Sequence, residues 1–269
     1  MTTGYVHGYD AIEARRLNDQ ARTLEALLHA DTAYPAGATV LEAGCGVGAQ
    51  TVALARTSPE ARITAIDVSA GSLAAAERRV RESGATNVTF RQADLFVLPF
   101  ADASFDHVFV CFVLEHLADP VAVLRALGRV LKPGGTITAI EGDHGTALFH
   151  PASDTADAAI AALVTLQRRA GGDALIGRRL YPLLVEAGFA AARVSPRMVY
   201  VDASRPELVE GFIRRTFTAM VAGVREEAIR AGLIDAGRFD AGIAALHRTA
   251  EPDGVFCYTF FKAVAVRPG

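Results

Sequence analysis

Short apolar segments alternate with helical segments along residues 39–143, and this alternation restricts the fold more than any other feature. Strands are predicted at 39–44, 62–69, 87–94, 105–114 and 136–143, with helices at 49–58, 70–84 and 120–131. Strands and helices at this interval form βαβ units, which give a parallel sheet covered by helices on both faces. We therefore expect a doubly wound α/β domain.

The flanking regions are mainly helical. Apolar residues recur at helical spacing over residues 11–30, and a Tyr-Pro-Ala-Gly turn at 34–37 ends that segment. Further helices are expected at about 153–170, at 177–187 and over most of 205–247, with strands at 192–202 and 254–267. Ligands of open α/β sheets bind at the carboxyl ends of the strands. We expect the helical block before the last strand to lie there and to select the substrate.

Composition excludes several classes of function. The chain has 269 residues, 51% of them hydrophobic, and a net charge of -3 from 27 basic and 30 acidic residues without a long run of one sign. This balance argues against a nucleic-acid partner. The apolar run at 107–114 is much too short to span a membrane, and the N-terminus lacks a signal-peptide core. Three scattered cysteines indicate free thiols, so we expect a cytoplasmic protein.

A glycine-rich loop follows the first strand. Gly44, Gly46 and Gly48 allow a sharp turn and the close approach of a ligand, and Asp67 ends the next strand, where it can accept hydrogen bonds from ribose hydroxyls. The loop also fits the G-x-G-x-x-A pattern of dinucleotide binding, so an NAD cofactor stays open. Glu42 separates the two interpretations, because its carboxylate would repel a pyrophosphate and would favour an amino group or a sulfonium.

Four motifs in order carry a resemblance that covers residues 35–143: VLEAGCGVGAQT, ITAIDVS, VTFRQADLFVLPFADASFDHVFVCFVLEHLADP and LGRVLKPGGTI. Together they resemble the class I S-adenosylmethionine-dependent methyltransferases, in particular the small-molecule enzymes related to ubiquinone and menaquinone C-methyltransferases. The resemblance implies a Rossmann-like seven-stranded sheet whose last strand is antiparallel. It implies methyl transfer from S-adenosylmethionine, with S-adenosylhomocysteine as product, to a small, partly apolar acceptor at carbon, oxygen or nitrogen.

The resemblance also implies an organisation within one domain. Residues 1–34 would form a helical lid over the cofactor, 35–143 the cofactor-binding core, 144–250 the substrate side and 251–269 the final strand. The implied cofactor contacts lie in the lid and at the ends of successive strands. They are Tyr9, Arg15, Gln20, Glu42, Gly44, Cys45, Gly46, Gly48, Asp67, Val68, Ala93, Asp94, Leu95, Cys111, Phe112 and His116. Asp94 has a structural alternative, which is to cap the turn that follows it.

The loop expected after the fifth strand, EGDHGTALFHP, is where a general base is expected. His144 is the candidate base, and Asp143 is its orienting partner or an alternative base. A base is needed only if the acceptor arrives protonated and weakly nucleophilic. The histidine spacing matches no metal-site signature, so no metal is assigned.

Two other functions stay open. One is a protein of the same fold that binds S-adenosylmethionine without transferring the methyl group, as a cyclase or a sensor. The other is an NAD-dependent oxidoreductase. The helical block and the N-terminal segment are compatible with a homo-oligomer, and the acceptor is expected to be a small molecule.

Overall fold

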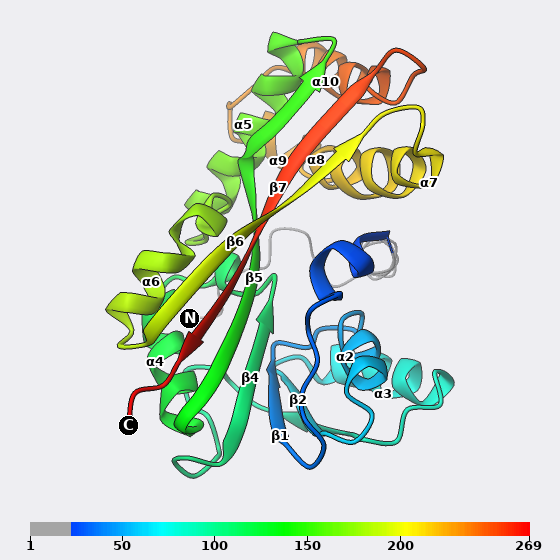
Figure 1. The fold of residues 1–269 in the computed structure, drawn as a ribbon. Coiled ribbons are helices and arrows are strands. Elements are labelled where there is room, and N and C mark those ends of the chain that lie inside the picture. The colour runs from blue at the N-terminus through cyan, green and yellow to red at the C-terminus, as the bar shows by residue number, and fades with distance from the viewer. Residues whose placement is uncertain (1–22) are drawn as a thin grey trace. The chain divides into compact units, whose positions relative to one another are not determined.

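The computed structural model describes residues 23–269, which form two compact units (Figure 1). We call residues 25–141, 176–197 and 261–269 the glycine-loop unit. We call the described residues 23–24, 142–175 and 198–260 the helical-insertion unit. The seven strands form one sheet in the order β3-β2-β1-β4-β5-β7-β6.

The glycine-loop unit contains the alternating elements that the sequence predicts, together with one short helix, η1, that it does not. They are β1 (Thr39–Ala43), α2 (Thr51–Thr57), β2 (Arg62–Asp67), α3 (Ala70–Glu82), β3 (Val88–Gln92), β4 (Phe105–Cys111), η1 (Leu114–His116), α4 (Pro120–Val130), η2 (Ile176–Arg179) and α6 (Leu180–Glu186). Local sequence sets the helix starts, because the side chains of Ser69 and Asp119 accept hydrogen bonds from the first turns of α3 and α4.

Parallel pairing brings the carboxyl ends of the central strands to one edge. Ala43 at the end of β1 pairs with Ile66 on β2 and with Val110 on β4, and Cys111 pairs with Ile140 on β5 (Leu131–His150). The residues that follow these positions therefore emerge side by side. This register is the reason why segments far apart in the sequence can build one site.

Different helices cover the two faces of this part of the sheet. Leu41 and Ala43 pack with the buried apolar residues of α4 and α6, whereas Ala65 packs with Leu73 and Ala76 of α3. Side chains of a strand alternate between faces, so the neighbouring positions Ala65 and Ile66 on β2 join different cores. The prediction of a sheet covered by helices on both faces is confirmed.

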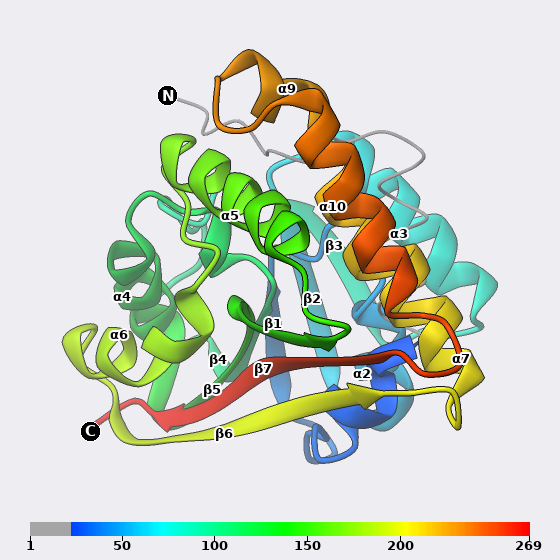
Figure 2. The same cartoon turned by 90° about the horizontal axis from the view of Figure 1, so that it is seen from above.

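The helical-insertion unit contains α5 (Asp154–Arg169), α7 (Pro206–Leu208), the π-helix η3 (Val209–Thr218), α8 (Ala219–Ala222), α9 (Arg225–Arg230) and α10 (Ala236–Arg248). Helices α5 and α10 lie side by side (Figure 2). Gly242 on α10 permits this, because a Cβ there would lie 2.4 Å from the Thr155 carbonyl oxygen. The unit also holds parts of β5, β6 (Ala190–Val201) and β7 (Val255–Val266).

One detail of the strands differs from expectation. β5 continues to His150, so the segment expected to be a loop after the fifth strand belongs to the strand. Its later residues have partners on β7, as in the hydrogen bond of 2.9 Å from the Thr259 amide to the Thr146 hydroxyl. The seven-stranded, mostly parallel sheet with an antiparallel last strand is as expected, and β7 lies between β5 and β6.

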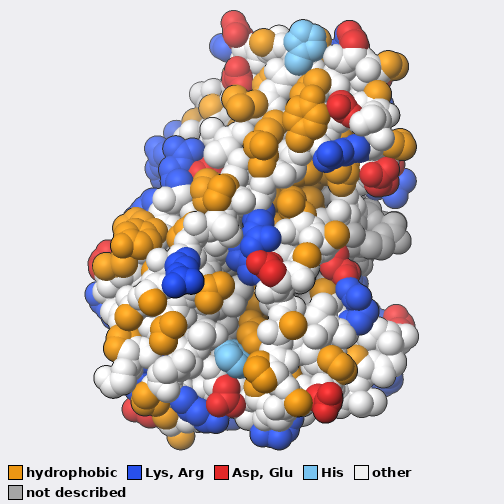
Figure 3. Space-filling view, viewed as in Figure 1, with side chains coloured by type: hydrophobic (Ala, Val, Ile, Leu, Met, Phe, Trp, Pro, Cys, Tyr) orange, Lys and Arg blue, Asp and Glu red, His pale blue; other side chains and the backbone are white. Residues whose placement is uncertain are grey.

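One face of the molecule carries charges of both signs. On the face in Figure 3, Lys and Arg side chains are interspersed with Asp and Glu side chains. Among residues 23–269, no helix combines the length and the apolarity that crossing a membrane requires.

Candidate functional site

The glycine loop joins β1 to α2, and backbone hydrogen bonds hold its conformation. The amides of Gly44 and Cys45 both donate to the Ile66 carbonyl, at 2.9 and 2.8 Å, and the Gly48 amide donates to the Cys45 carbonyl at 2.9 Å. Gly44, Gly46 and Gly48 all have positive φ angles, between 51° and 77°. This is the left-handed region, which favours glycine.

Two of these glycines are also required by close packing. A Cβ on Gly44 would lie 2.6 Å from a methyl group of Val113, and a Cβ on Gly48 would lie 2.9 Å from the backbone of Ala76 on α3. Among residues 23–269, nothing lies within 4 Å of the Cβ position of Gly46. The loop is thus tightly packed on two sides and open at its middle glycine, where a ligand can approach the backbone.

Asp67, at the end of β2, organises this loop. One carboxylate oxygen accepts from the Gly46 amide at 2.8 Å, and the other accepts from the Ser69 amide at 2.8 Å. A carboxylate oxygen has two lone pairs, so each oxygen can still accept from a ligand hydroxyl. The sequence predicted a ligand contact at Asp67 and did not predict this second role.

Glu42 is buried behind the loop, with 2% of the residue exposed. Its Oε2 has no hydrogen-bond partner among the described residues. Burial raises the pKa of Glu42 to about 7, with a smaller contribution from Asp67, while the Thr51 hydroxyl opposes the shift. An unsatisfied buried carboxyl oxygen beside an open glycine loop is a suitable partner for a cationic ligand group.

The segment after β3 holds three of the predicted contacts. Ala93 is buried, Leu95 is half-buried, and the exposed Asp94 accepts from the Phe96 amide at 2.9 Å. The structural alternative for Asp94, capping its own turn, is therefore present, and its other oxygen takes no part in that bond. Val68, which follows β2, is 57% exposed, so its apolar side chain is accessible to a flat ring of a ligand.

The loop after β4 reaches the glycine loop through Val113 and is held by a residue that sequence reasoning did not assign. Glu141 is fully buried, and one of its oxygens accepts from the amides of Val113 at 3.0 Å and Leu114 at 2.8 Å. Burial raises the pKa of Glu141 well above its usual range. The sequence signal that could have indicated a role for Glu141 is an acidic residue inside an otherwise apolar strand.

Three other predicted residues lie on or beside this loop. Phe112 has a φ of 58°, which is strained for a residue with a large side chain. The side chain of His116 lies 3.7 Å from the carboxylate of Glu115. Cys111 is buried, as is Cys45 on the glycine loop, and burial raises the pKa of both thiols, so neither is a thiolate nucleophile.

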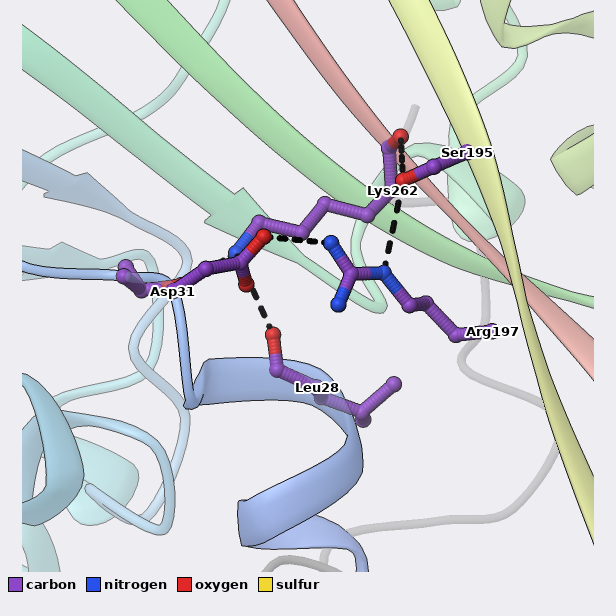
Figure 4. Close-up of polar contacts among 6 residues, drawn as sticks. Leu28, Asp31, Ser195, Arg197 and Lys262 are labelled. Atoms are coloured by element: carbon purple, nitrogen blue, oxygen red, sulfur yellow. Dashed lines mark hydrogen bonds and ion pairs between the residues drawn. The ribbon is translucent and has the colours of Figure 1, made fainter.

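An ionic cluster around the buried Lys262 anchors residues 28–32 beside the sheet (Figure 4). The ammonium of Lys262, on β7, donates to the Leu28 carbonyl at 3.3 Å, to Asp31 at 2.6 Å and to the Thr32 hydroxyl at 2.5 Å. Arg197 on β6 pairs with the other oxygen of Asp31 at 2.5 Å. Sequence reasoning placed no function at Lys262.

The anchored segment contacts the end of the glycine loop. His29 is buried, and its Nε2 lies 2.6 Å from the side-chain oxygen of Gln50, the residue that precedes α2. Burial lowers the pKa of His29 to about 4, so the ring is neutral at physiological pH. Tyr9, Arg15 and Gln20, which were expected to close on the cofactor, lie outside the described residues.

His144 lies on β5 within the helical-insertion unit, and its expected place on a loop was wrong because β5 is longer than the sequence indicates. Its Nδ1 lies 2.7 Å from the hydroxyl of Tyr258 on β7. Asp143 is buried and accepts from the Gly145 amide at 3.0 Å. Neighbouring strand residues point to opposite faces, which makes Asp143 poorly placed to orient His144.

Aromatic rings surround the histidine and tyrosine. The rings of Phe217 and His144 meet edge to face with centroids 6.1 Å apart, and Phe217 and Phe212 lie 5.5 and 5.8 Å from the Tyr258 ring. Both phenylalanines are on η3, and π-helical turns are frequent at functional sites. Across residues 23–269, no group of three or more histidine, cysteine or acidic side chains is placed to hold a metal ion.

Comparison with known proteins identifies the glycine-loop region. Residues 41–139 match the family described as a methyltransferase domain. The demethylmenaquinone methyltransferase of Bacillus velezensis is 36% identical over 106 residues, which cover 39% of this chain and 46% of that protein. The chain spans 24–59% of the length of the curated relatives it matches.

Solved structures share the fold over nearly the whole chain. A phosphoethanolamine N-methyltransferase of Haemonchus contortus in complex with S-adenosyl-L-methionine aligns with a TM-score of 0.56 at 18% identity, covering 93% of this chain and 53% of that one. The [4+2]-cyclase SpnF aligns with a TM-score of 0.55 at 22% identity, covering 93% and 81%. At these identities the likeness concerns the fold alone.

Proposed function

We propose, from the premise that residues 41–139 belong to the class I S-adenosylmethionine-dependent methyltransferase family, that this protein methylates a small, partly apolar molecule. The observation that carries the proposal is the buried Glu42 carboxyl behind a glycine loop organised by Asp67, with one oxygen that has no partner within residues 23–269. This pair of carboxylates suits a ligand that has both a cationic group and a ribose. A pyrophosphate would be disfavoured beside Glu42.

The residues present fit S-adenosylmethionine. Glu42 would hold the cationic methionine portion, Asp67 the ribose hydroxyls, and Val68 and Leu95 the adenine ring, with Asp94 as acceptor for the adenine amino group. When bound, the cofactor supplies an activated methyl group on a sulfonium that is a good leaving group. The remaining contribution of the protein is to align the acceptor and exclude water.

His144 is the proposed base for an acceptor that arrives protonated. A neutral imidazole can take a proton from a hydroxyl or an amine, leaving an electron pair free to attack the methyl carbon. The Phe217 ring at 6.1 Å gives such an acceptor an apolar aromatic surface beside the base. These contacts support a partly apolar substrate.

Calorimetric titration tests the cofactor assignment. S-adenosylhomocysteine should bind with micromolar affinity and NADH should bind more weakly. Asp67→Ala should weaken binding by about one to several kcal/mol, because it removes a ribose partner and the acceptor for the Gly46 amide. Asp157→Ala, on the exposed side of α5, is the control and should bind normally. Absence of binding to folded wild-type protein would refute the proposal.

Methyl transfer itself needs a separate assay. A cofactor with an isotopically labelled methyl group, incubated with candidate acceptors, should give a labelled product, and His144→Ala should lower turnover with little change in cofactor affinity. A second candidate function is binding without methyl transfer, since the cyclase SpnF shares the fold. Cofactor binding without labelled product from an identified substrate would favour that function.

A further inference from the structure

The hydroxyl of Tyr258 provides His144 with a fixed partner inside the helical-insertion unit. Tyr258 is 2% exposed, His144 is buried, and the 2.7 Å between the hydroxyl and Nδ1 is a short hydrogen bond. The direction of this bond decides which nitrogen carries the proton in the neutral ring: a hydroxyl that accepts from Nδ1–H leaves Nε2 unprotonated, and one that donates to Nδ1 leaves the proton on Nε2. Whatever chemistry His144 performs at Nε2 therefore depends on Tyr258.

The backbone opposite Tyr258 is shaped to admit its phenol. Gly142 lies two residues before His144 on β5, so both positions face the same side of the strand. A Cβ on Gly142 would lie 2.4 Å from the Tyr258 hydroxyl oxygen and 3.4 Å from the ring carbon that bears it. Only glycine leaves space for the tyrosine to lie against the strand and reach His144.

Packing holds the tyrosine in this position from the other sides. Its ring has neighbours at centroid distances of 4.8 Å (Phe260), 5.5 Å (Phe217) and 5.8 Å (Phe212). The hydrogen bond between Thr259 and Thr146 fixes β7 against β5 one residue away. The hydroxyl is therefore positioned by a rigid surrounding, as a group that orients another must be.

We infer that Tyr258 is a positioning residue for the reaction, accepting the Nδ1 proton of His144 and keeping Nε2 as the basic nitrogen. This inference rests on the proposed role of His144 as base. The proton that leaves the acceptor hydroxyl or amine moves to Nε2, and the ring becomes an imidazolium whose Nδ1–H still donates to the Tyr258 oxygen. The electron pair left on the acceptor would then be available to the activated methyl group that S-adenosylmethionine supplies, with the sulfonium as leaving group.

The first test reads the tautomer directly, without any substrate. Long-range proton–nitrogen NMR spectra of 15N-labelled protein should show His144 with a protonated Nδ1 and an unprotonated Nε2, assigned by comparison with His144→Asn. In Tyr258→Phe the His144 signals should move to the averaged values of a ring that exchanges between tautomers. Tyr200→Phe, which removes an exposed tyrosine hydroxyl of the same unit, is the control and should leave the signals unchanged.

Gly142→Ala tests the same contact from β5, because its methyl group should displace the Tyr258 hydroxyl. It should alter the His144 signals as Tyr258→Phe does. A proton on Nε2 in the wild type, or unchanged signals in both variants, would overturn the inference whether or not the protein is a methyltransferase.

Kinetics with an identified acceptor then separate this inference from the proposed function. Tyr258→Phe should lower kcat at least tenfold with less than a twofold change in KM and in affinity for S-adenosylhomocysteine, since only the orientation of the base is lost. An unchanged kcat in Tyr258→Phe, when His144→Ala is inactive, would refute the role of Tyr258 alone. Full activity of His144→Ala would refute the proposed role of His144 as base. The NMR spectra would then still test whether Tyr258 fixes the tautomer of His144.

Discussion

Glu42→Gln should separate the cost of a buried carboxyl from its use in binding. Burial raises the pKa of Glu42 from an ordinary 4.5 to about 7, so between these pH values the folded protein keeps a proton that the unfolded chain has released. Stability from this group is then fully present below pH 4.5 and is lost as the pH rises to 7. The pKa difference corresponds to about 3 kcal/mol. The carboxyl is 2% exposed, so solvent screens this energy little.

The variant has a neutral side chain at every pH, so it should lack this part of the pH dependence. Urea unfolding of wild type and Glu42→Gln should give a stability difference that shifts by about 2 to 3 kcal/mol in favour of the variant between pH 4.5 and pH 8. Comparing the two proteins at each pH cancels the other titrating groups. Glu82→Gln, on the exposed surface of α3, should show no such change.

Cofactor binding should respond in the opposite direction. The ionised Glu42 carboxylate favours the ammonium of S-adenosylhomocysteine, so wild-type affinity should fall up to tenfold for each pH unit below 7. Glu42→Gln should bind more weakly at pH 8 and show no such pH dependence in calorimetric titrations. A stability difference that stays constant from pH 4.5 to 8 would refute the protonated state of Glu42 and the reasoning built on it.

Two further substitutions test the loop and the ionic cluster. Gly48→Ala should weaken S-adenosylhomocysteine binding at least tenfold in calorimetry, because its methyl group would lie 2.9 Å from Ala76. Gly84→Ala is the control, since Gly84 has a similar φ but open space around its Cβ position. Equal effects of the two substitutions would contradict the packing argument. Burial alone would raise the pKa of Asp31, but the hydrogen bonds and charges of Lys262 and Arg197 hold it at about 2. Asp31→Asn should therefore lower the free energy of unfolding at pH 7 by about 1 kcal/mol, a value reduced because the Asp31 side chain is half-exposed. Thermal unfolding measures this loss. That loss should shrink as the pH falls from 4 to 2, and a pH-independent loss would exclude the ion pair as its cause.

Much of the glycine-loop unit could be predicted because its information is local. A strand, a helix and the turn between them are specified by residues a few positions apart, as with the Ser69 cap of α3. Carboxylates at strand ends, such as Glu42 and Asp67, could be placed at one edge because parallel strands share direction. The hydrogen bond from the Gly46 amide to Asp67 could not be predicted, because it depends on the three-dimensional path of the glycine loop.

The partners of the buried polar side chains could not be predicted, because they come from distant parts of the chain. Tyr258 and His144 are 114 residues apart, and Lys262 and Asp31 are 231 apart. In the sequence Tyr258 and Lys262 are ordinary residues of an apolar strand, and the length of β5 was misjudged for the same reason. The later part of β5 is stabilised by β7 and not by its own composition.

By itself, the sequence determined the alternation of strands and helices, the glycine loop and the carboxylates that follow the strands, because these depend on local propensity and on the geometry of a parallel sheet. Tertiary structure decided which polar groups meet in the interior. Burial excludes water, so each buried polar group depends on whatever partner the fold brings within about 3 Å. That requirement makes Gly142, Tyr258 and His144 one arrangement, although no pattern in the sequence connects them.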